Sequence, residues 1–159
     1  MNKKYTSTFP NFKLGTHESA GGLRRALLAC GCRIGKWGSD ILDQVTVSPT
    51  ETTVELVVVT VADLYFKEGA TRMAIYERAM ALGLELCPSE VGPQLRLQYQ
   101  DQPQDEWLRI AMEPILDSEG YRGIFRVGHE HGELCLDGNF GNPHNFWHSF
   151  SSWVFLRRK

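Results

Sequence analysis

The stretch TTVELVVVTV at 52–61 constrains the fold more than any other part of the chain. Most of its residues are branched at Cβ, and such residues favour extended backbone because they fit a pleated sheet better than a helix. Its apolar residues are consecutive and do not alternate with polar ones, which is typical of a strand that is covered on both faces. We therefore expect 52–61 to be a central strand of a sheet.

Helical patterns lie on either side of this strand. Apolar residues at a spacing of three and four predict a helix over 19–30, with Ser19 as its N-cap. A shorter helix is predicted over 39–45, where Ser39 precedes DILDQV, and a third over 71–82. The first half of the chain therefore contains the predicted helices.

Beyond Pro88 the apolar runs are short and separated by turn residues, which predicts strands. The expected strands are 94–99, 106–113, 123–128, 133–137 and 152–158. This distribution predicts an α+β fold, in which N-terminal helices pack on one face of a mainly antiparallel sheet formed largely by the C-terminal half. We expect residues 1–159 to form a single domain, with 1–16 as a loosely ordered arm that holds at most one short strand.

Composition narrows the classes of function. The chain is 42% hydrophobic and 23% charged with a formal net charge of −2, so we expect a globular protein without the positive field of a nucleic-acid binder. The longest apolar run, 56–59, is too short to cross a membrane, and no signal-peptide pattern follows Lys3 and Lys4. We expect a cytoplasmic protein whose four cysteines are reduced.

The cysteines give weak indications of chemistry. Cys30 and Cys32 could be half of a metal site, but no second CxC or CxxC pair supplies the other ligands. Cys87 and Cys135 could be nucleophiles only if a neighbouring cation stabilised the thiolate. Cys87 follows a predicted helix C-terminus and Cys135 shares its strand face with carboxylates, and both settings disfavour the thiolate. Structural cysteines are the favoured interpretation.

Residues 69–115, which contain LGLELCPSEVGPQLRLQY, resemble a family of small uncharacterised bacterial proteins, and the closing WVFLRRK is similar to the C-termini of that family. The resemblance implies a bacterial or mobile-element origin and a free-standing small domain. It brings no catalytic residue, cofactor or partner with it.

The segment at 127–148 is rich in histidine and could bind zinc. His129 and His131 would share one side of an extended segment, and a short helix opened by Asn142 would place His144 and His148 on one face. The four histidines could form a tetrahedral set, or three ligands could hold the metal with a bound water and Glu130 as base, and this defines the alternative hypothesis of a zinc-dependent hydrolase. The competing interpretation is a glycine-rich loop with solvated histidines, which predicts no cofactor and no catalytic residue.

Two further groups of residues are candidates for binding. Arg96, Arg109 and Glu113 are expected on one sheet face, where they could form a cross-strand ion pair or bind an anion. Phe146, Trp147 and Phe150 lie among small polar residues, a setting that recurs where proteins contact partners, although the loop could instead fold over one end of the sheet. We therefore hypothesise a non-enzymatic binding domain that contacts another protein, with nucleic acid and membrane partners not expected.

Overall fold

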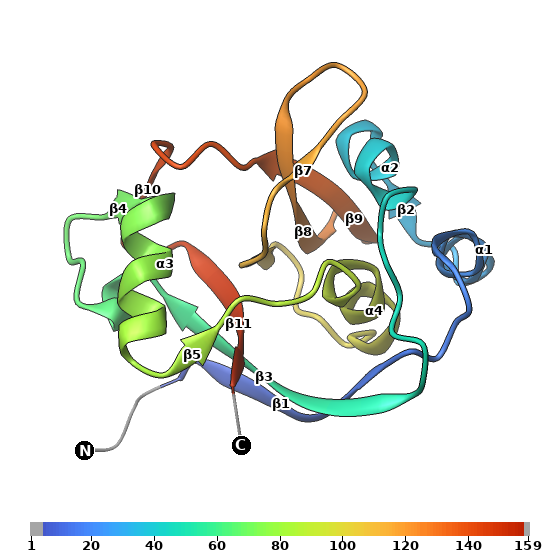
Figure 1. Cartoon of the computed structure of the whole chain (residues 1–159), viewed down its shortest axis with the longest axis horizontal. Helices are drawn as coiled ribbons and strands as arrows, with labels where there is room; N and C mark the ends of the chain where they lie inside the picture. Colours follow the sequence, from blue (N-terminus) through green and yellow to red (C-terminus); the bar gives the residue numbers. More distant parts are fainter. Residues whose placement is uncertain (1–4, 158–159) are drawn as a thin grey trace.

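A computed structural model describes residues 5–157 and contains one large, strongly curved sheet with helices around it (Figure 1). The strands are β1 (Ser7–Leu14), β2 (Arg33–Ile34), β3 (Thr52–Thr60), β4 (Ala70–Thr71), β5 (Leu84–Glu85), β6 (Trp107–Ile110), β7 (Ile115–Leu116), β8 (Arg122–Glu130), β9 (Glu133–Phe140), β10 (Phe146–Trp147) and β11 (Ser152–Arg157). The helices are α1 (Ala20–Ala29), α2 (Lys36–Leu42), α3 (Arg72–Ala81) and α4 (Val91–Gln98), with a short 3-10 turn η1 (Ala62–Leu64).

The large sheet is mixed. Its strands follow the order β1-β3-β11-β6-β8-β9-β2, with β5 paired to β11 and β7 paired to β8. The β6–β11 and β2–β9 pairs are parallel, whereas the β1–β3, β3–β11, β6–β8 and β8–β9 pairs are antiparallel. Strands β4 and β10 form a separate two-stranded ribbon. Residues 5–157 contain four helices beside these strands and have an α+β fold, as the sequence predicts.

The central strand predicted from the sequence is confirmed. Strand β3 lies between β1 and β11, and its residues 56–59 are each at most 2% exposed. Within the expected N-terminal arm, residues 7–14 form a strand of eight residues that pairs with β3, which is longer than the one short strand expected there. Phe12 and Leu14 are buried in this strand, and their burial holds it against the sheet. Residues 1–4 lie outside the described part.

Two of the predicted helices are confirmed with their caps. The Ser19 hydroxyl accepts a hydrogen bond from the Gly22 amide at 3.1 Å, and Thr71 caps α3 through the Ala74 amide at 3.2 Å. Helix α2 begins earlier than expected, at Lys36, and its N-cap is Gly35. The Ser39 side chain instead accepts a hydrogen bond from Arg24, so it serves as a contact to α1.

The predicted strand over 94–99 is wrong, because residues 91–98 form helix α4. The alternation of polar and apolar residues in QLRLQY predicts a strand only if the polar residues face water. Gln94 and Arg96 are instead buried and hydrogen-bonded, so the helix is covered on most sides. Pro93 is tolerated because it lies in the first turn.

Helix α4 lies inside the curve of the sheet (Figure 1). It contacts β1 near one edge of the sheet and β8 and β9 near the other. The expected packing of helices on a single face is not confirmed. A Cβ on Gly92 of α4 would meet the Phe125 ring, whereas Tyr76 of α3 packs on Trp153. Strand register places Phe125 and Trp153 on opposite faces.

The remaining predicted strands correspond to β6, β8, β9 and β11, with β6 shorter than expected and β9 longer. Buried residues from these strands, from β3 and from the helices form one contiguous core. Within residues 5–157, no helix has the length and apolar character needed to cross a membrane.

Candidate binding site

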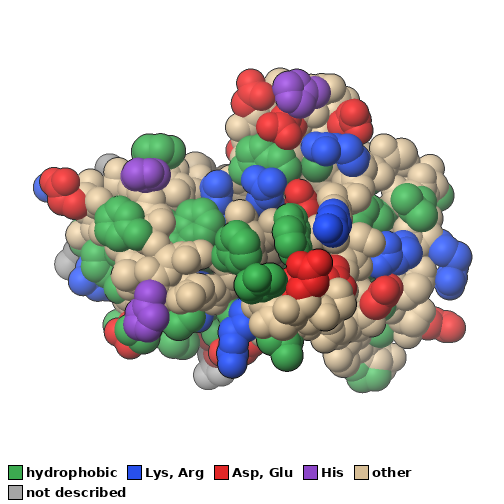
Figure 2. Space-filling model, turned by 90° about the horizontal axis from the view of Figure 1, so that it is seen from above, with side chains coloured by type: hydrophobic (Ala, Val, Ile, Leu, Met, Phe, Trp, Pro, Cys, Tyr) green, Lys and Arg blue, Asp and Glu red, His purple; other side chains and the backbone are tan. Residues whose placement is uncertain are grey.

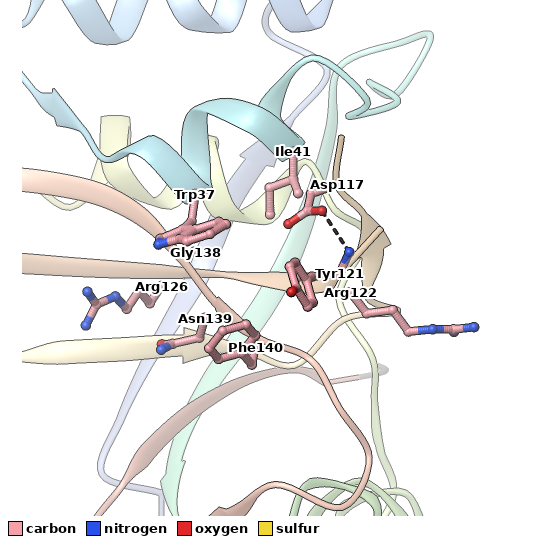
Figure 3. Close-up of a pocket in the computed structure, with 10 residues that line it drawn as sticks. Trp37, Ile41, Asp117, Tyr121, Arg122, Arg126, Gly138, Asn139 and Phe140 are labelled. Carbon is pink, nitrogen blue, oxygen red and sulfur yellow. Dashed lines mark hydrogen bonds between the residues drawn. The ribbon is translucent and has the colours of Figure 1, made fainter. Parts of the chain in front are cut away.

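A cavity of about 210 Å³ lies between α2, the turn before β8, and the end of β9 (Figure 3). Its walls include aromatic, aliphatic and polar side chains. The side chains that line the cavity include Trp37, Ile41, Asp117, Tyr121, Arg122, Arg126, Asn139 and Phe140. These residues come from three regions of the chain that are far apart in sequence, so the fold brings them together.

Three aromatic side chains dominate this cavity, and each is substantially exposed. Trp37 is 38% exposed, Tyr121 54% and Phe140 56%. The Phe140 ring centroid lies 6.3 Å from that of Trp37 and 6.1 Å from that of Tyr121, so the three rings form one cluster (Figure 3). Clustered exposed rings around a hollow are typical of surfaces that contact a ligand, because a folded chain otherwise buries such area.

Two glycines explain why Trp37 reaches the cavity. A Cβ on Gly35 would lie 2.2 Å from the Asp137 carboxylate, and a Cβ on Gly38 would lie 2.7 Å from the Asp137 Cα. Only glycine allows the start of α2 to approach β9 this closely. The Gly38 amide also donates to Asp137 Oδ1 at 3.2 Å. The indole of Trp37 is thereby held beside the end of β9.

The turn that carries Tyr121 is organised by one carboxylate. Asp117 Oδ1 accepts hydrogen bonds from the Glu119 amide at 2.9 Å and from the Tyr121 amide at 2.8 Å. Asp40 of α2 accepts two further bonds from Ser118, through its amide and its hydroxyl. These bonds fix the turn against α2, and the Asp117 carboxylate lines the cavity.

Two arginines lie at the borders of the cavity, and Figure 3 shows their side chains extending away from the aromatic rings. Arg126 Cζ lies 4.1 Å from the centroid of the Trp107 ring, and Arg126 Nη2 forms an ion pair with Asp137 Oδ2 at 3.4 Å. Asn139 Oδ1 is buried without a hydrogen-bond partner and belongs to the same cavity lining. A buried acceptor of this kind is costly unless a donor reaches it.

A second hollow of about 440 Å³ adjoins the first and shares Tyr121, Arg122 and Phe140 with it. Its other lining residues include Asn142 and Asn145. The two hollows form a continuous surface in which Phe140 and Tyr121 stand at the junction.

The aromatic segment predicted as a contact surface divides into outward and inward residues. Phe146 is 59% exposed and Phe150 is 77% exposed. The His148 ring stacks on Phe150 with 5.4 Å between centroids, and it contacts Phe146 edge to face. Trp147 is partly buried, so it is a poor candidate for contact with a partner.

Trp147 packs against Trp153 at 5.2 Å between ring centroids, and the Arg109 guanidinium lies 5.1 Å from the Trp147 centroid. Burial and, to a smaller extent, the neighbouring Arg126 lower the pKa of Arg109 to about 10. Arg109 and Arg126 are direct cross-strand partners on β6 and β8. Arg109 therefore anchors the aromatic segment to the sheet.

The structure does not bring Arg96, Arg109 and Glu113 together as one group. Arg96 is fully buried on α4 and donates hydrogen bonds to Gln102 and to the carbonyls of Gly128, Tyr99 and Cys135. Burial lowers the pKa of its guanidinium. Glu113 lies beyond the end of β6 and is exposed. The structure thus gives Arg96 a packing role rather than a place in a surface site.

The four histidines of the zinc hypothesis do not converge. His129 lies in β8, where Nδ1 contacts the Gln102 carbonyl at 2.7 Å, and His131 occupies the following turn with φ of 52°. The predicted helix over 142–148 is wrong, because Phe146 and Trp147 pair with β4 as strand β10. Figure 2 shows the histidine side chains well separated on the face in view. No cluster of three or more metal-binding side chains occurs within residues 5–157.

The cysteines are free thiols. Cys87 and Cys135 are buried, and burial raises the pKa of the Cys87 thiol well above its ordinary value. Arg33 Nη2 lies 3.2 Å from Cys135 Sγ, a cationic contact that the strand pattern did not predict. Cys32 is also buried, and this burial is the main cause that raises the pKa of its thiol.

Comparison with known proteins yields no matching family model, no matching curated protein and no matching solved structure. The resemblance of residues 69–115 to small bacterial proteins therefore stays a prediction. The class that the fold and the site define is an α+β domain with an aromatic cavity.

Proposed function

We propose that this protein is a non-enzymatic binding domain and that the cavity bounded by Trp37, Tyr121 and Phe140 is its binding site. The observation that carries the proposal is the clustering of these exposed rings around a preformed hollow. Burial of the exposed parts of the three rings by a ligand would supply favourable hydrophobic free energy.

The partner would be another protein, which would insert one side chain into the cavity. The second hollow, with Asn142 and Asn145, would accept the residues next to that side chain. The free thiols of the described cysteines support a reducing, cytoplasmic location. A bacterial or mobile-element origin rests on the resemblance alone.

The test uses nitrogen-15-labelled protein and a library of small fragments. Ligands of the cavity should shift the amide signals of Gly123 and Gly138, which line it. Phe140→Ser should abolish these shifts, whereas Phe150→Ser should leave them intact, because Phe150 is also an exposed ring but lies outside the cavity. Shifts that persist in Phe140→Ser, or that fall in both variants, would contradict the proposal.

A second candidate surface is the pair Phe146 and Phe150, stacked around His148. Its exposure favours contact with a partner protein, as the aromatic composition predicts. We expect the double variant Phe146→Ala, Phe150→Ala to lose any partner captured through this surface and to stay folded. Retention of every partner by that variant would eliminate the surface.

A further inference from the structure

The aromatic cavity is suited to one chemical class of ligand. We propose that it binds a compact organic cation, such as a quaternary ammonium or a methylated amine, in contact with the faces of Trp37, Tyr121 and Phe140. This inference rests on the proposed function, because it names the ligand class of the same cavity.

The angles between the rings favour a compact group over a flat one. The planes of Trp37 and Phe140 meet at 46°, and those of Tyr121 and Phe140 at 77°. Rings at such angles form walls around a hollow, whereas a flat aromatic ligand is best held between parallel rings. A methylated ammonium group presents methyl groups in several directions and can contact all three walls.

The size of the hollow agrees with such a group. Its volume of about 210 Å³ is several times the roughly 30 Å³ that one liquid water molecule occupies. Ile41 closes one side of it with an apolar surface (Figure 3). Methyl groups of the ligand would lose contact with water there at little cost in free energy, whereas an unmethylated ammonium would lose hydrogen bonds to water.

The charged groups that line the hollow are one carboxylate, Asp117, and two guanidinium groups, Arg122 and Arg126. The faces of aromatic rings are negative, and the Asp117 carboxylate adds a full negative charge to the lining. Lys36 Nζ lies 5.4 Å from the Trp37 ring centroid, so a ligand cation would share this ring with a cation of the protein itself.

The two bordering arginines oppose a cation only weakly. Arg126 is paired with Asp137, and its guanidinium rests on the Trp107 ring. Arg122 is exposed to solvent, where its charge is screened, and its side chain extends away from the rings (Figure 3). An anion would instead have to approach Asp117 and the ring faces.

The test compares three probes of nearly identical shape, namely choline, its neutral carbon analogue 3,3-dimethylbutan-1-ol, and the anion 3,3-dimethylbutanoate. Each is titrated into the full chain while the Gly123 and Gly138 amide signals are followed. We expect choline to bind more tightly than the neutral alcohol by roughly 3- to 30-fold. The carboxylate should bind most weakly.

Two variants distinguish the effect of the Asp117 carboxylate in the lining from the effect of a nearby carboxylate outside the lining. Asp117→Asn keeps an oxygen for the Glu119 and Tyr121 amides, and it should reduce the preference for choline by roughly 2- to 5-fold. Glu119→Gln removes an exposed carboxylate of the same turn that does not line the cavity, and it should leave the preference unchanged. An equal reduction in both variants, or none in Asp117→Asn, would overturn the inference.

The outcomes for wild-type protein are distinct. Equal binding of the alcohol and choline, or tighter binding of the carboxylate, overturns the cation inference but leaves the cavity as a binding site. If no probe shifts the Gly123 and Gly138 signals and the fragment library shifts none either, both the inference and the proposed function fail.

Discussion

The guanidinium of Arg109 lies 5.1 Å from the centroid of the Trp147 ring, and Trp147 in turn meets the buried Trp153 edge to face. Arg109 and Trp153 are register partners on the parallel strands β6 and β11. This contact ties the two-residue strand β10 to the main sheet. The neighbours Phe146 and His148 are exposed as a result.

Removal of this anchor should cost stability. We expect Trp147→Ala to lower the free energy of unfolding by about 2–4 kcal/mol, because a partly buried indole leaves a void against Trp153. Phe146→Ala, the adjacent exposed ring, should change it by less than about 0.5 kcal/mol. Urea unfolding measures both values, and equal effects would refute the anchoring role.

Arg96 should be more sensitive still. Its guanidinium is fully buried and donates to Gln102 and to three backbone carbonyls that connect α4 with β8 and β9. We expect Arg96→Met to destabilise the protein by about 3 kcal/mol or more, because it leaves these acceptors without donors. Arg96→Lys should restore only part of the loss, since an ammonium lacks the planar fork. A variant as stable as wild type would contradict this view of α4.

Thiol reactivity should distinguish the cysteines. Cys30 is exposed, whereas Cys32, Cys87 and Cys135 are buried. Burial also raises the pKa of Cys32 and of Cys87, so their reactive thiolate forms are rarer. We expect a thiol reagent to modify one cysteine rapidly in native protein, and Cys30→Ser to abolish that fast phase. Two or more fast thiols in wild type would contradict the burial pattern.

Stability should fall at alkaline pH through Tyr76. Burial raises the pKa of Tyr76 to about 12, above the ordinary value of 10.0. The native state therefore keeps its proton where the unfolded state has lost it, so this contribution is complete below pH 10 and is lost as pH rises toward 12. The loss should be on the order of 2–3 kcal/mol. Burial also raises the pKa of Tyr99, so Tyr76→Phe should reduce the pH dependence of urea unfolding without removing it. An unchanged slope in that variant would show that Tyr76 titrates normally.

The parts of the fold that sequence predicted are those where local pattern and burial agree. Strand β3 and helix α3 combine suitable propensity with an apolar run or stripe, and Thr71 supplies a cap. The strand predicted over 94–99 is a helix because the polar residues Gln94 and Arg96 are buried and hydrogen-bonded. The alternation of polar and apolar residues in the sequence does not reveal these bonds. The length of the edge strand β1 was not predicted because its pairing with β3 is a long-range contact.

The candidate site was missed for a similar reason. Trp37 and Tyr121 lie in segments between the predicted helices and strands, and Phe140 lies in the glycine-rich stretch. Aromatic residues within such turn segments are an available signal, but the meeting of the three rings depends on the approach of α2 to β9 at Gly35 and Gly38. The histidines of the zinc hypothesis have different surroundings, because His129 contacts the Gln102 carbonyl whereas His148 stacks on Phe150.

The most direct test of the binding account is the set of intermolecular nuclear Overhauser contacts from the methyl protons of bound choline. We predict contacts to ring protons of Trp37, Tyr121 and Phe140, which line the same cavity. Contacts to Phe146 and Phe150 in their place would contradict the account, because those rings belong to the other exposed surface.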